Sequence, residues 1–565
     1  MKSTERSAHK RGRRRRLVVA TVVLLVLVAI RIVGFWGGSG GFVQFIAGQR
    51  SGARIAIAPE ATVAPSDGTP QVRVRVTLGD RVHRVEPEYV SLAIDLSQVT
   101  GGLWWDPTAQ GNETGSGTVA APQFDFARPQ LDALVAPLVP AYLRIGGSES
   151  DKIFYDIHEP ALRPASVPEG YDGVLTAGQW NALNAFAERN GLGLVVTLNA
   201  GPSARSADGA WNPENSRELL SYAAASNHDV AVWELGNEVN NFWYVFGPRQ
   251  AVSARRYAED AALAAALIDQ LDPDAWFGGQ GAMIWPVLGE PVGALFGMSR
   301  GALAHAGDLQ RVVSWHYYPQ QGRRGPIASR RATPDRLLDP ANLDEAAIWA
   351  RHFRSLRDRY APQAQLWLGE TGNAQFGGEP GLSDAYLGGL WWLDQLGLLA
   401  RERHDVVVRQ SLTGLNYGLL SEPELAPRPD YWNTLLWKHT MGREVFAAEV
   451  SAAAGVGARY ADRVRVYAHS AAGVRLPESR AILAINLNHD RSALVAIPEL
   501  AGKHYLRYAV TTPDVFGDQL LVNGARLELE SGAPPARLQG AAARANGAGL
   551  AIELPPLSYS FVVVP

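Results

Sequence analysis

Residues 230–238 read VAVWELGNE, an apolar run that ends in an amide and a carboxylate. A short run of apolar and β-branched residues favours a buried strand. Residues 365–371, QLWLGET, have the same form and carry a second glutamate near their end. Two strands that deliver Glu238 and Glu370 at their carboxyl ends predict a site built on paired carboxylates.

Runs of this kind recur through residues 89–425, where they alternate with longer helical patterns such as the one at 249–271. This alternation indicates βα units and a parallel sheet. Eight strand-like runs are present, at residues 90–95, 141–147, 193–201, 230–238, 276–282, 311–318, 365–371 and 406–418. Eight units predict an α/β fold, a (β/α)8 TIM barrel over 89–425, whose active site lies at the carboxyl ends of the strands. The two glutamates then follow strands four and seven and face each other across the barrel mouth.

The last part of the chain, residues 426–565, has a different pattern. Helical periodicity largely stops, and short alternating runs such as RVRVYAHSA and LSYSFVVVP are separated by turn residues. This pattern is typical of a β-sandwich. The segment 71–88 opens with another alternating run, QVRVRVTL, that has no partner in the barrel. We expect it to join the sandwich, so that this domain is formed by segments from both before and after the barrel.

The amino-terminal residues predict export. Residues 1–16 end in KRGRRRR, which indicates a basic cytoplasmic segment, and residues 17–36 are mostly apolar with one arginine, Arg31. A basic head before an apolar run predicts a membrane anchor or a cleaved signal. We favour the anchor because no small-residue cleavage site follows. Residues 37–70 are predicted to form a linker, which leaves the catalytic domain outside the cytoplasm, either membrane-anchored or exported to a periplasm or medium.

The amino-acid composition excludes several classes of protein. The chain is 47% hydrophobic and 19% charged, as folded globular proteins are. A net charge of -3 gives no general attraction to nucleic acid, so none is expected as a partner. The absence of cysteine excludes thiol catalysis and disulfides.

Paired carboxylates at a barrel mouth suggest glycoside hydrolysis. Retaining glycosidases place two carboxyl groups about 5–5.5 Å apart, one as acid/base and one as nucleophile. The acid needs a raised pKa, whereas the nucleophile must stay ionised and needs hydrogen-bond donors around it. Asn237, next to Glu238, can donate a hydrogen bond to a sugar 2-hydroxyl.

Strand six supplies aromatic and imidazole groups in the run SWHYY, residues 314–318. Alternation puts His316 and Tyr318 on one face of the strand. If that face points into the barrel, the Tyr318 hydroxyl can hold Glu370 ionised. The alternative is that these rings only fill the barrel. The chain contains no HExxH motif, close histidine pair or aspartate-rich loop, so neither a metal nor another cofactor is expected.

Six segments together resemble glycoside hydrolase family 79, the heparanase and β-glucuronidase family. They are WELGNEVN, LWLGETG, YLRIGGSESD, SWHYY, VVVRQSLTGLNYG and PDYWNTLLWK, and the resemblance runs from about residue 89 to the terminal strand. It implies a retaining mechanism with Glu238 as acid/base and Glu370 as nucleophile.

The resemblance also implies substrate contacts. The family binds a uronate carboxylate through backbone amides of a glycine pair and a tyrosine, which match Gly377, Gly378 and Tyr417. Asp95 on strand one matches an aspartate that faces the terminal sugar, and Ser148 stands at the position of a small hydroxyl residue after strand two. Consecutive glycine amides form an anion-binding concavity, which is a physical reason for such a site.

The sequence departs from animal heparanases in its charges. It has five lysines in total, and Glu149 stands beside Ser148 where a basic residue is expected. No long excisable linker follows strand two. A preference for highly sulfated heparan is therefore not expected, and neither is cleavage into two subunits.

We therefore expect a retaining hydrolase that acts on a glucuronic-acid-containing oligosaccharide, polysaccharide or glucuronide. Two alternatives stay open. One is a barrel glycosidase for neutral β-glycosides with the same two glutamates. The other is a polysaccharide-binding protein without catalytic activity.

Overall fold

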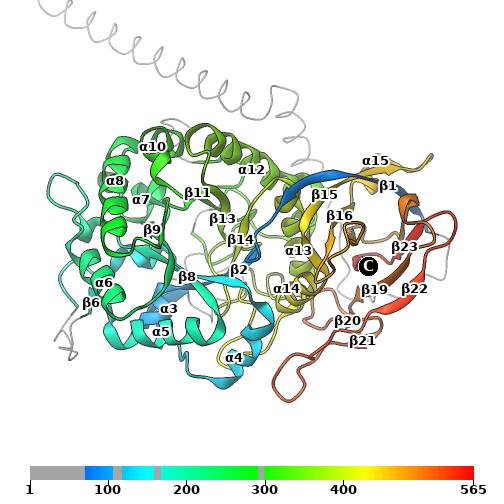
Figure 1. Cartoon of the computed structure of the whole chain (residues 1–565), viewed down its shortest axis with the longest axis horizontal. Helices are drawn as coiled ribbons and strands as arrows, with labels where there is room; N and C mark the ends of the chain where they lie inside the picture. Colours follow the sequence, from blue (N-terminus) through cyan, green and yellow to red (C-terminus); the bar gives the residue numbers. More distant parts are fainter. Residues whose placement is uncertain (1–69, 106–117, 158–166, 291–297, 327) are drawn as a thin grey trace, which may run out of the picture.

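A closed barrel of parallel strands forms the larger part of the molecule (Figure 1). The computed structural model describes residues 70–105, 118–157, 167–290, 298–326 and 328–565. The barrel strands are β2 (Val90–Asp95), β5 (Ala141–Gly146), β8 (Leu192–Leu198), β9 (Val230–Leu235), β10 (Trp276–Gly278), β11 (Ala282–Ile284), β12 (Val312–Tyr317), β13 (Gln365–Thr371) and β14 (Val406–Gln410). All eight predicted strand positions are therefore confirmed.

The fifth position differs from the prediction because it is split into β10 and β11. β10 pairs with β9 and reaches β12 through Gly278, whereas β11 pairs only with β12 among the placed strands. The break falls in a glycine-rich run, where Gly281 has a φ of 55°. A Cβ atom on Gly281 would lie 2.4 Å from His316 Nε2. The glycines thus interrupt the strand and leave space for an imidazole inside the barrel.

Helices surround the barrel and bury its outer apolar face. They are α4 (Pro129–Val135), α5 (Ala177–Asn190), α6 (Glu214–Ala225), α8 (Ala254–Leu271), α10 (Met298–Ala306), α12 (Pro340–Tyr360), α13 (Tyr386–Arg401) and α14 (Pro429–Thr440). Inside, Val195, Val232, Val408 and Trp367 form part of a separate small core. Because side chains alternate along a strand, residues further along the inner faces are carried to the mouth.

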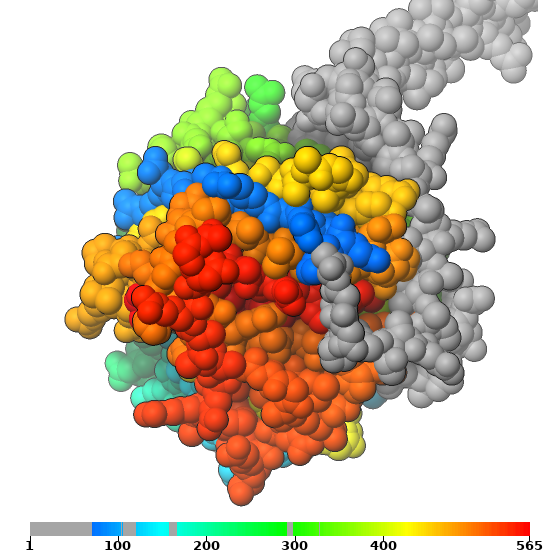
Figure 2. All heavy atoms as spheres, turned by 90° about the vertical axis from the view of Figure 1, so that its right-hand side faces the viewer, coloured from blue at the N-terminus to red at the C-terminus, as the bar shows by residue number. Residues whose placement is uncertain are grey.

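The second domain is a β-sandwich that also contains the amino-terminal strand, as predicted. β1 (Val72–Arg84) lies between β15 (Met441–Ala452), which is antiparallel, and β18 (Ala493–Ile497), which is parallel. Figure 2 shows β1 in blue beside the yellow β15. The sandwich core contains alternate residues of β1 and of the strands β16 (Val464–Ala471), β17 (Arg480–Asn486), β23 (Leu550–Leu554) and β24 (Ser558–Val564).

A buried polar contact joins the two domains. Asp394 on α13 accepts hydrogen bonds from Arg465 at 3.0 Å and from the Tyr467 hydroxyl at 2.6 Å, both on β16. Aromatic residues of the sandwich, including Tyr559 and Phe561, belong to the same apolar core as the barrel helices. The sandwich is therefore packed against the barrel through α13 and α14.

The predicted basic segment and anchor, residues 1–36, and residues 37–69 of the predicted linker lie outside the described residues. Among the helices that are placed, none combines the length and apolar character needed to cross a membrane.

Candidate active site

Glu238 stands in a tight turn just beyond β9. The strand ends at Leu235, and Glu238 follows three residues later. Gly236 has a φ of 73°, and a Cβ atom there would lie 2.5 Å from Val239. Glu238 itself has a left-handed φ of 52°, and its amide donates to the Gln280 carbonyl at 2.8 Å. Such backbone strain in a non-glycine residue is characteristic of functional sites.

Glu370 points into the barrel because β13 contains a bulge. Trp315 pairs with Leu368, but the next residue of β12, His316, pairs with Glu370. The extra residue is Gly369, where a Cβ atom would lie 2.0 Å from Ser314 Oγ. A bulge of this kind changes which face a following side chain occupies. Glycine at 369 therefore allows Glu370 to share the inner face with His316.

Arg144 on β5 connects the groups around the two glutamates. Its guanidinium donates to Glu234 at 2.9 Å, to Glu370 Oε2 at 2.9 Å and to Asn237 Oδ1 at 3.0 Å. Burial lowers the pKa of Arg144, but the carboxylates of Glu234 and Glu370 outweigh this effect and raise it. Thr197 completes the group by donating to Glu234 at 2.9 Å. Charged residues are almost never fully buried without a partner, and here each charge has one.

Sequence reasoning missed Arg144 and Glu234. Both stand inside apolar strand runs, YLRIGG and VAVWEL, and are 1% exposed. A charged residue within a predicted buried strand was the signal that could have identified them.

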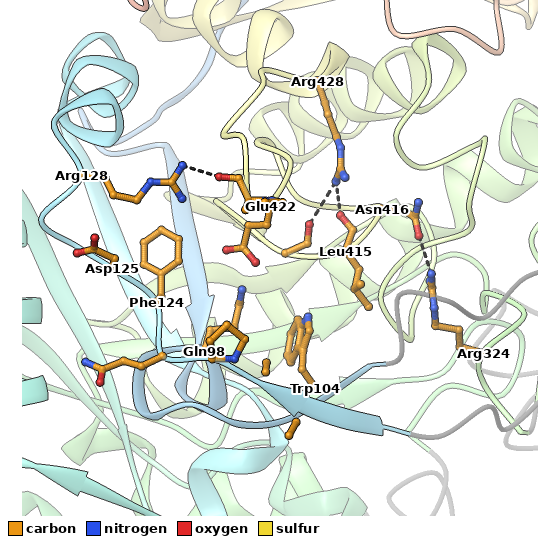
Figure 3. A pocket seen from close by; sticks show the side chains of 16 residues that line it. Gln98, Trp104, Phe124, Asp125, Arg128, Arg324, Leu415, Asn416, Glu422 and Arg428 are labelled. Carbon is orange, nitrogen blue, oxygen red and sulfur yellow. Dashed lines mark hydrogen bonds between the residues drawn. The ribbon is translucent and has the colours of Figure 1, made fainter.

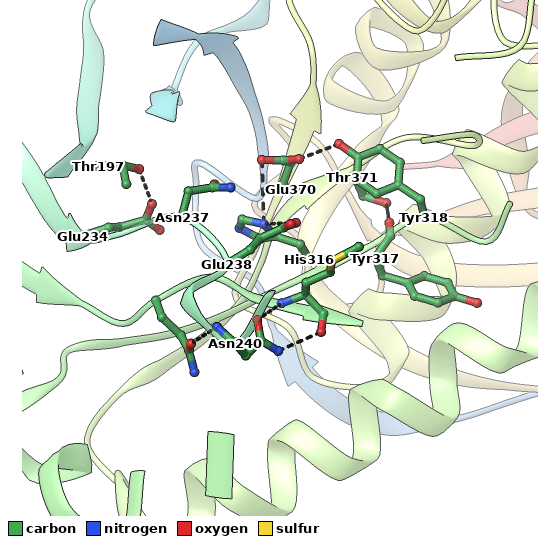
Figure 4. Close-up of polar contacts among 12 residues, drawn as sticks. Thr197, Glu234, Asn237, Glu238, Asn240, His316, Tyr317, Tyr318, Glu370 and Thr371 are labelled. Carbon is green, nitrogen blue, oxygen red and sulfur yellow. Dashed lines mark hydrogen bonds and ion pairs between the residues drawn. The ribbon is translucent and has the colours of Figure 1, made fainter. Parts of the chain in front are cut away.

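The structure brings His316 and Tyr318 of strand six together beside the two glutamates (Figure 4). The Tyr318 hydroxyl donates to Glu370 Oε1 at 2.6 Å. His316 Nδ1 lies 3.0 Å from Glu238 Oε1 and 3.7 Å from Glu370 Oε2. Trp315 and Tyr317 pack on the opposite face, in the core beneath the helices.

The two glutamates have different electrostatic environments. Burial, followed by the nearby charge of Glu370, raises the pKa of Glu238 well above its usual range. Glu370 has direct donors on both oxygens, from Arg144 and Tyr318. Burial, with a contribution from Arg144, lowers the pKa of His316 well below its usual value. A neutral imidazole, a carboxyl that holds its proton and a second carboxyl with donors on both oxygens thus lie side by side.

Asp95 and Ser148 lie at the ends of strands one and two. Asp95 caps helix α3 (Leu96–Thr100), because its Oδ1 accepts from the Ser97 amide at 3.2 Å. Burial, Glu149 and Glu370 together raise the pKa of Asp95 to about 8. Ser148 begins the 3-10 helix η2 (Ser148–Lys152) and is half-buried, and its hydroxyl makes no hydrogen bond within the described ranges.

Gly377, Gly378 and Tyr417 come together in loops after β13 and β14. The glycines have φ values of 79° and 85°, which side-chain-bearing residues rarely adopt. The Gly377 carbonyl accepts from the Asn416 amide at 3.0 Å, and the Gly378 carbonyl accepts from Arg324 at 3.1 Å. In the part of the chain that is placed, neither glycine amide donates a hydrogen bond. The loop therefore presents two backbone N–H groups that can bind a ligand, whereas its two carbonyls already accept hydrogen bonds.

Tyr417 connects this glycine loop with Tyr318, the tyrosine that donates to Glu370. Its ring stacks on that of Tyr318 with centroids 6.4 Å apart, and Trp104 completes a small aromatic cluster with them. Apart from Ser148, each predicted site residue thus makes a hydrogen bond or a ring contact among the described residues, and their joint role in one site stays a prediction.

The spacing of Glu238, His316 and Glu370 is also one that a metal ion can use, since one ligand atom from each lies within 4.8 Å of the others. However, both oxygens of Glu370 already accept hydrogen bonds, and the positive charge of Arg144 lies 2.9 Å away. This arrangement suits proton transfer and nucleophilic attack better than cation binding. The absence of a metal cofactor stays a prediction.

The chain is similar to known glycosidases in sequence. The model of the glycosyl hydrolase family 79 N-terminal domain matches residues 72–397. Heparanase from Mus musculus is 27% identical over 536 residues, covering 85% of this chain and 90% of that protein. Heparanase-like protein 1 from Arabidopsis thaliana is 28% identical over 390 residues, or 66% of each. The protein named inactive heparanase-2 from Homo sapiens is 28% identical over 403 residues, covering 69% of this chain and 64% of that protein.

Solved structures share the fold. A family 51 arabinofuranosidase from Xanthomonas axonopodis pv. citri aligns with a TM-score of 0.61 at 16% identity, covering 88% of this chain and 100% of that one. A 4-O-alpha-L-rhamnosyl-beta-D-glucuronidase from Fusarium oxysporum aligns with a TM-score of 0.58 at 15% identity, covering 87% of this chain and 100% of that one. The family match covers more than half of the sequence, includes both strands that carry the glutamates, and accords with the barrel fold. The chain belongs to glycosyl hydrolase family 79.

Proposed function

We propose that this glycoside hydrolase is a retaining β-glucuronidase or heparanase-like enzyme. The observation that carries the proposal is the pair Glu238 and Glu370, whose nearest oxygens lie within 4.8 Å of each other. Burial raises the pKa of Glu238, whereas Glu370 accepts a hydrogen bond on each oxygen. Retaining glycosidases need carboxyl groups about 5–5.5 Å apart, whereas inverting enzymes need about 6.5–9.5 Å to admit a water. The short separation supports the double-displacement mechanism.

In the first step, a carboxylate oxygen of Glu370 attacks the anomeric carbon while Glu238 donates its proton to the leaving oxygen. The glycosidic bond breaks, and the sugar becomes bonded to Glu370. In the second step, Glu238, now a carboxylate, takes a proton from water, whose oxygen displaces Glu370. Tyr318 and Arg144 hold Glu370 in position for both steps, since they bind its two oxygens.

His316 orients the acid. His316 Nε2 has no hydrogen-bond partner among the placed residues. With the ring proton on Nδ1, Nε2 is left as an unpaired acceptor, whereas the other tautomer would leave an unpaired N–H donor at Nε2. Nδ1–H then donates to Glu238 Oε1 at 3.0 Å. The other oxygen of Glu238 is left to carry the catalytic proton. Because Glu238 must be protonated, we expect activity to fall as pH rises through its raised pKa.

Asn237 is positioned to bind the 2-hydroxyl of the sugar. Its Oδ1 accepts a hydrogen bond from Arg144, which orients the side chain, and its backbone N–H donates to Asp151, which holds the backbone. The NH2 group of Asn237 therefore faces away from Arg144 and is available as a donor. A hydrogen bond to the 2-hydroxyl strengthens as charge develops at the ring.

Gly377, Gly378 and Tyr417 supply donors for a uronate carboxylate. Two free amides on a positive-φ loop and a buried phenol suit an anion better than a neutral hydroxymethyl group. Arg324 binds the Gly378 carbonyl and adds positive charge behind the loop. This group favours glucuronides over the neutral β-glycosides of the alternative function.

The leaving-group side of the cleft favours substrates without dense sulfation. The segments 239–247 and 280–289 follow strands four and five, next to the acid, and contain no lysine or arginine. Arg205 is instead paired with Asp260 at 2.7 Å, and Arg323 with Glu379. Sulfate groups need cationic partners, and the lack of lysine and arginine in these two segments argues against highly sulfated heparan as the substrate.

A polysaccharide-binding protein without activity stays a second candidate, because the family includes a relative named inactive heparanase-2. Here both glutamates and their hydrogen-bond partners are present, which supports catalysis. We also propose that the catalytic domain acts outside the cytoplasm, as the basic and apolar amino-terminal residues suggest.

Assays of an aryl β-glucuronide and the matching β-glucoside test the substrate class, and Tyr417→Phe tests its cause. A lost hydrogen bond to a charged group is worth about 1.5–3 kcal/mol. The glucuronide kcat/KM should therefore fall roughly ten- to a hundredfold, whereas the glucoside value should fall much less. Tyr386→Phe is the matched control, because this buried tyrosine contacts the sandwich. Equal losses for both sugars, or a faster glucoside than glucuronide in the unmodified enzyme, would contradict the uronate assignment.

A further inference from the structure

A short turn, residues 285–289, follows β11 at the rim of the barrel. Its ends pair with each other, because Trp285 and Gly289 exchange backbone hydrogen bonds of 2.9 and 2.8 Å. The ring of Trp285 lies 6.0 Å from that of Tyr244 in α7 (Phe242–Val245), the helix that comes shortly after Glu238. The 285–289 turn is therefore on the side of the barrel where the proposed mechanism places the leaving group.

Hydrogen bonds tie the segment before this turn to the acid. The Glu238 backbone N–H donates to the Gln280 carbonyl at 2.8 Å. The side chain of Asn240 binds both the N–H and the carbonyl of Met283, each at 3.0 Å (Figure 4). Because the turn begins directly after β11, its starting point is fixed relative to Glu238.

A pocket of about 490 Å³, whose lining includes Trp104, Leu415 and Glu422, lies elsewhere, at the ends of strands one and eight (Figure 3). Those strands, β2 and β14, are across the barrel from β9 and β10. A leaving group that takes its proton from Glu238 therefore lies beside the 285–289 turn and not in that pocket.

The turn has a backbone conformation that its residues do not favour. Val287 has a φ of 71°, in the left-handed region, and the adjacent Leu288 is 58% exposed at the tip. A positive φ is costly for a β-branched residue and persists only where the surrounding structure imposes it. The turn thus needs contacts from neighbouring elements to keep this shape.

Glu345 on α12 supplies the main contact. One of its carboxylate oxygens accepts a hydrogen bond from the Val287 backbone N–H at 2.7 Å, and the other lies 2.7 Å from Arg330 Nη1. Arg330 belongs to the loop after β12. One fully buried carboxylate thus joins α12 to the loops that follow strands five and six, and each of its oxygens has a donor.

Two further contacts hold the same turn. The Ser329 hydroxyl, also in the loop after β12, donates to the Pro286 carbonyl at 2.8 Å. Gly289 lies against Trp349 of α12, because a Cβ atom there would be 2.2 Å from the indole ring. The turn is therefore fixed to α12 and to the loop after β12, while its tip stays open to a ligand.

We propose that Glu345 is a positioning residue for the reaction, which holds the 285–289 turn in the shape that binds the leaving group. Because Glu345 is fully buried, it touches neither the sugar nor the reacting atoms. Its effect should therefore appear with leaving groups that are large enough to contact the turn. This inference rests on the proposed glucuronidase function.

Glu345→Gln tests the inference with two substrates, a naphthyl β-glucuronide and β-glucuronosyl fluoride. Arg330 is charged and should take the amide oxygen, so that the NH2 group faces the Val287 N–H and releases the turn. One lost hydrogen bond to a charged group should lower kcat/KM for the naphthyl substrate about tenfold. The value for the fluoride should change little, because a fluoride leaving group offers the turn no ring to bind.

Two other variants complete the test. Asp344→Asn is the matched control, because Asp344 precedes Glu345 on α12 but pairs with Arg465 of the sandwich. It should change neither value. Ser329→Ala removes the bond to the Pro286 carbonyl without leaving a buried charge unpaired, so it should fold even if Glu345→Gln does not. A lost neutral hydrogen bond should lower the naphthyl value about threefold and spare the fluoride.

The ratio of the two kcat/KM values decides between the readings. Equal losses for both substrates in Glu345→Gln would mean that Glu345 only stabilises the fold, and would overturn the inference. An unchanged ratio in Ser329→Ala would overturn it as well. If the unmodified protein cleaves neither glucuronide, the proposed function falls and this inference falls with it, whereas cleavage of both with an unchanged ratio in the variants overturns the inference alone.

Discussion

Glu370→Gln should lose turnover of an aryl β-glucuronide by several orders of magnitude while keeping its fold. The amide is nearly isosteric with the carboxylate but cannot attack the anomeric carbon. Its neighbours can accommodate it, because the amide oxygen can accept from Arg144 while the NH2 group donates to the Tyr318 hydroxyl. The change therefore removes the nucleophile and keeps one hydrogen bond to each neighbour, although the Tyr318 hydroxyl becomes the acceptor instead of the donor.

Two control measurements belong with this variant. Thermal unfolding should be close to that of the unmodified protein. The pKa of Glu238, followed by carboxyl NMR, should fall, because the charge of Glu370 helps to raise it. Near-normal turnover in a properly folded variant would remove Glu370 from the mechanism.

Glu238→Ala should make the rate depend strongly on the leaving group. Without a general acid, substrates with poor leaving groups should be cleaved very slowly, whereas activated phenols can still depart. The covalent intermediate should then accumulate, since no carboxylate activates water. Mass spectrometry should detect the protein with the sugar attached.

Azide gives this second variant a sharper test. The anion needs no general base, so it should restore turnover in Glu238→Ala and give a β-glucuronosyl azide. It should not restore Glu370→Gln, which is the matched control. An α-azide, or no rescue at all, would show that Glu238 is not the acid/base of a retaining site.

The strand positions were predictable because each run is apolar, short and followed by a helical pattern. The two glutamates could be identified in the same way, since their strands end in the polar residues that a barrel mouth requires. The pairing of β1 with the sandwich also followed from its alternation and its lack of a barrel partner. These features depend on local pattern, which a sequence displays directly.

The supporting residues were harder to predict because they depend on contacts between distant strands. Arg144 lies 226 positions from Glu370 along the chain. The bulge at Gly369 and the break around Gly281 arise from close approach to Ser314 and His316, which periodicity does not reveal. The hydrogen bond from Gln98 to Thr413 likewise joins segments 315 residues apart.

The stereochemistry of the first product tests the central claim most directly. Proton NMR of an aryl β-glucuronide with fresh enzyme should show β-glucuronic acid first, before mutarotation produces the α anomer. Two displacements at one carbon, by Glu370 and then by water, predict this retention. Initial formation of the α anomer, or no hydrolysis of any β-glucuronide, would contradict the account.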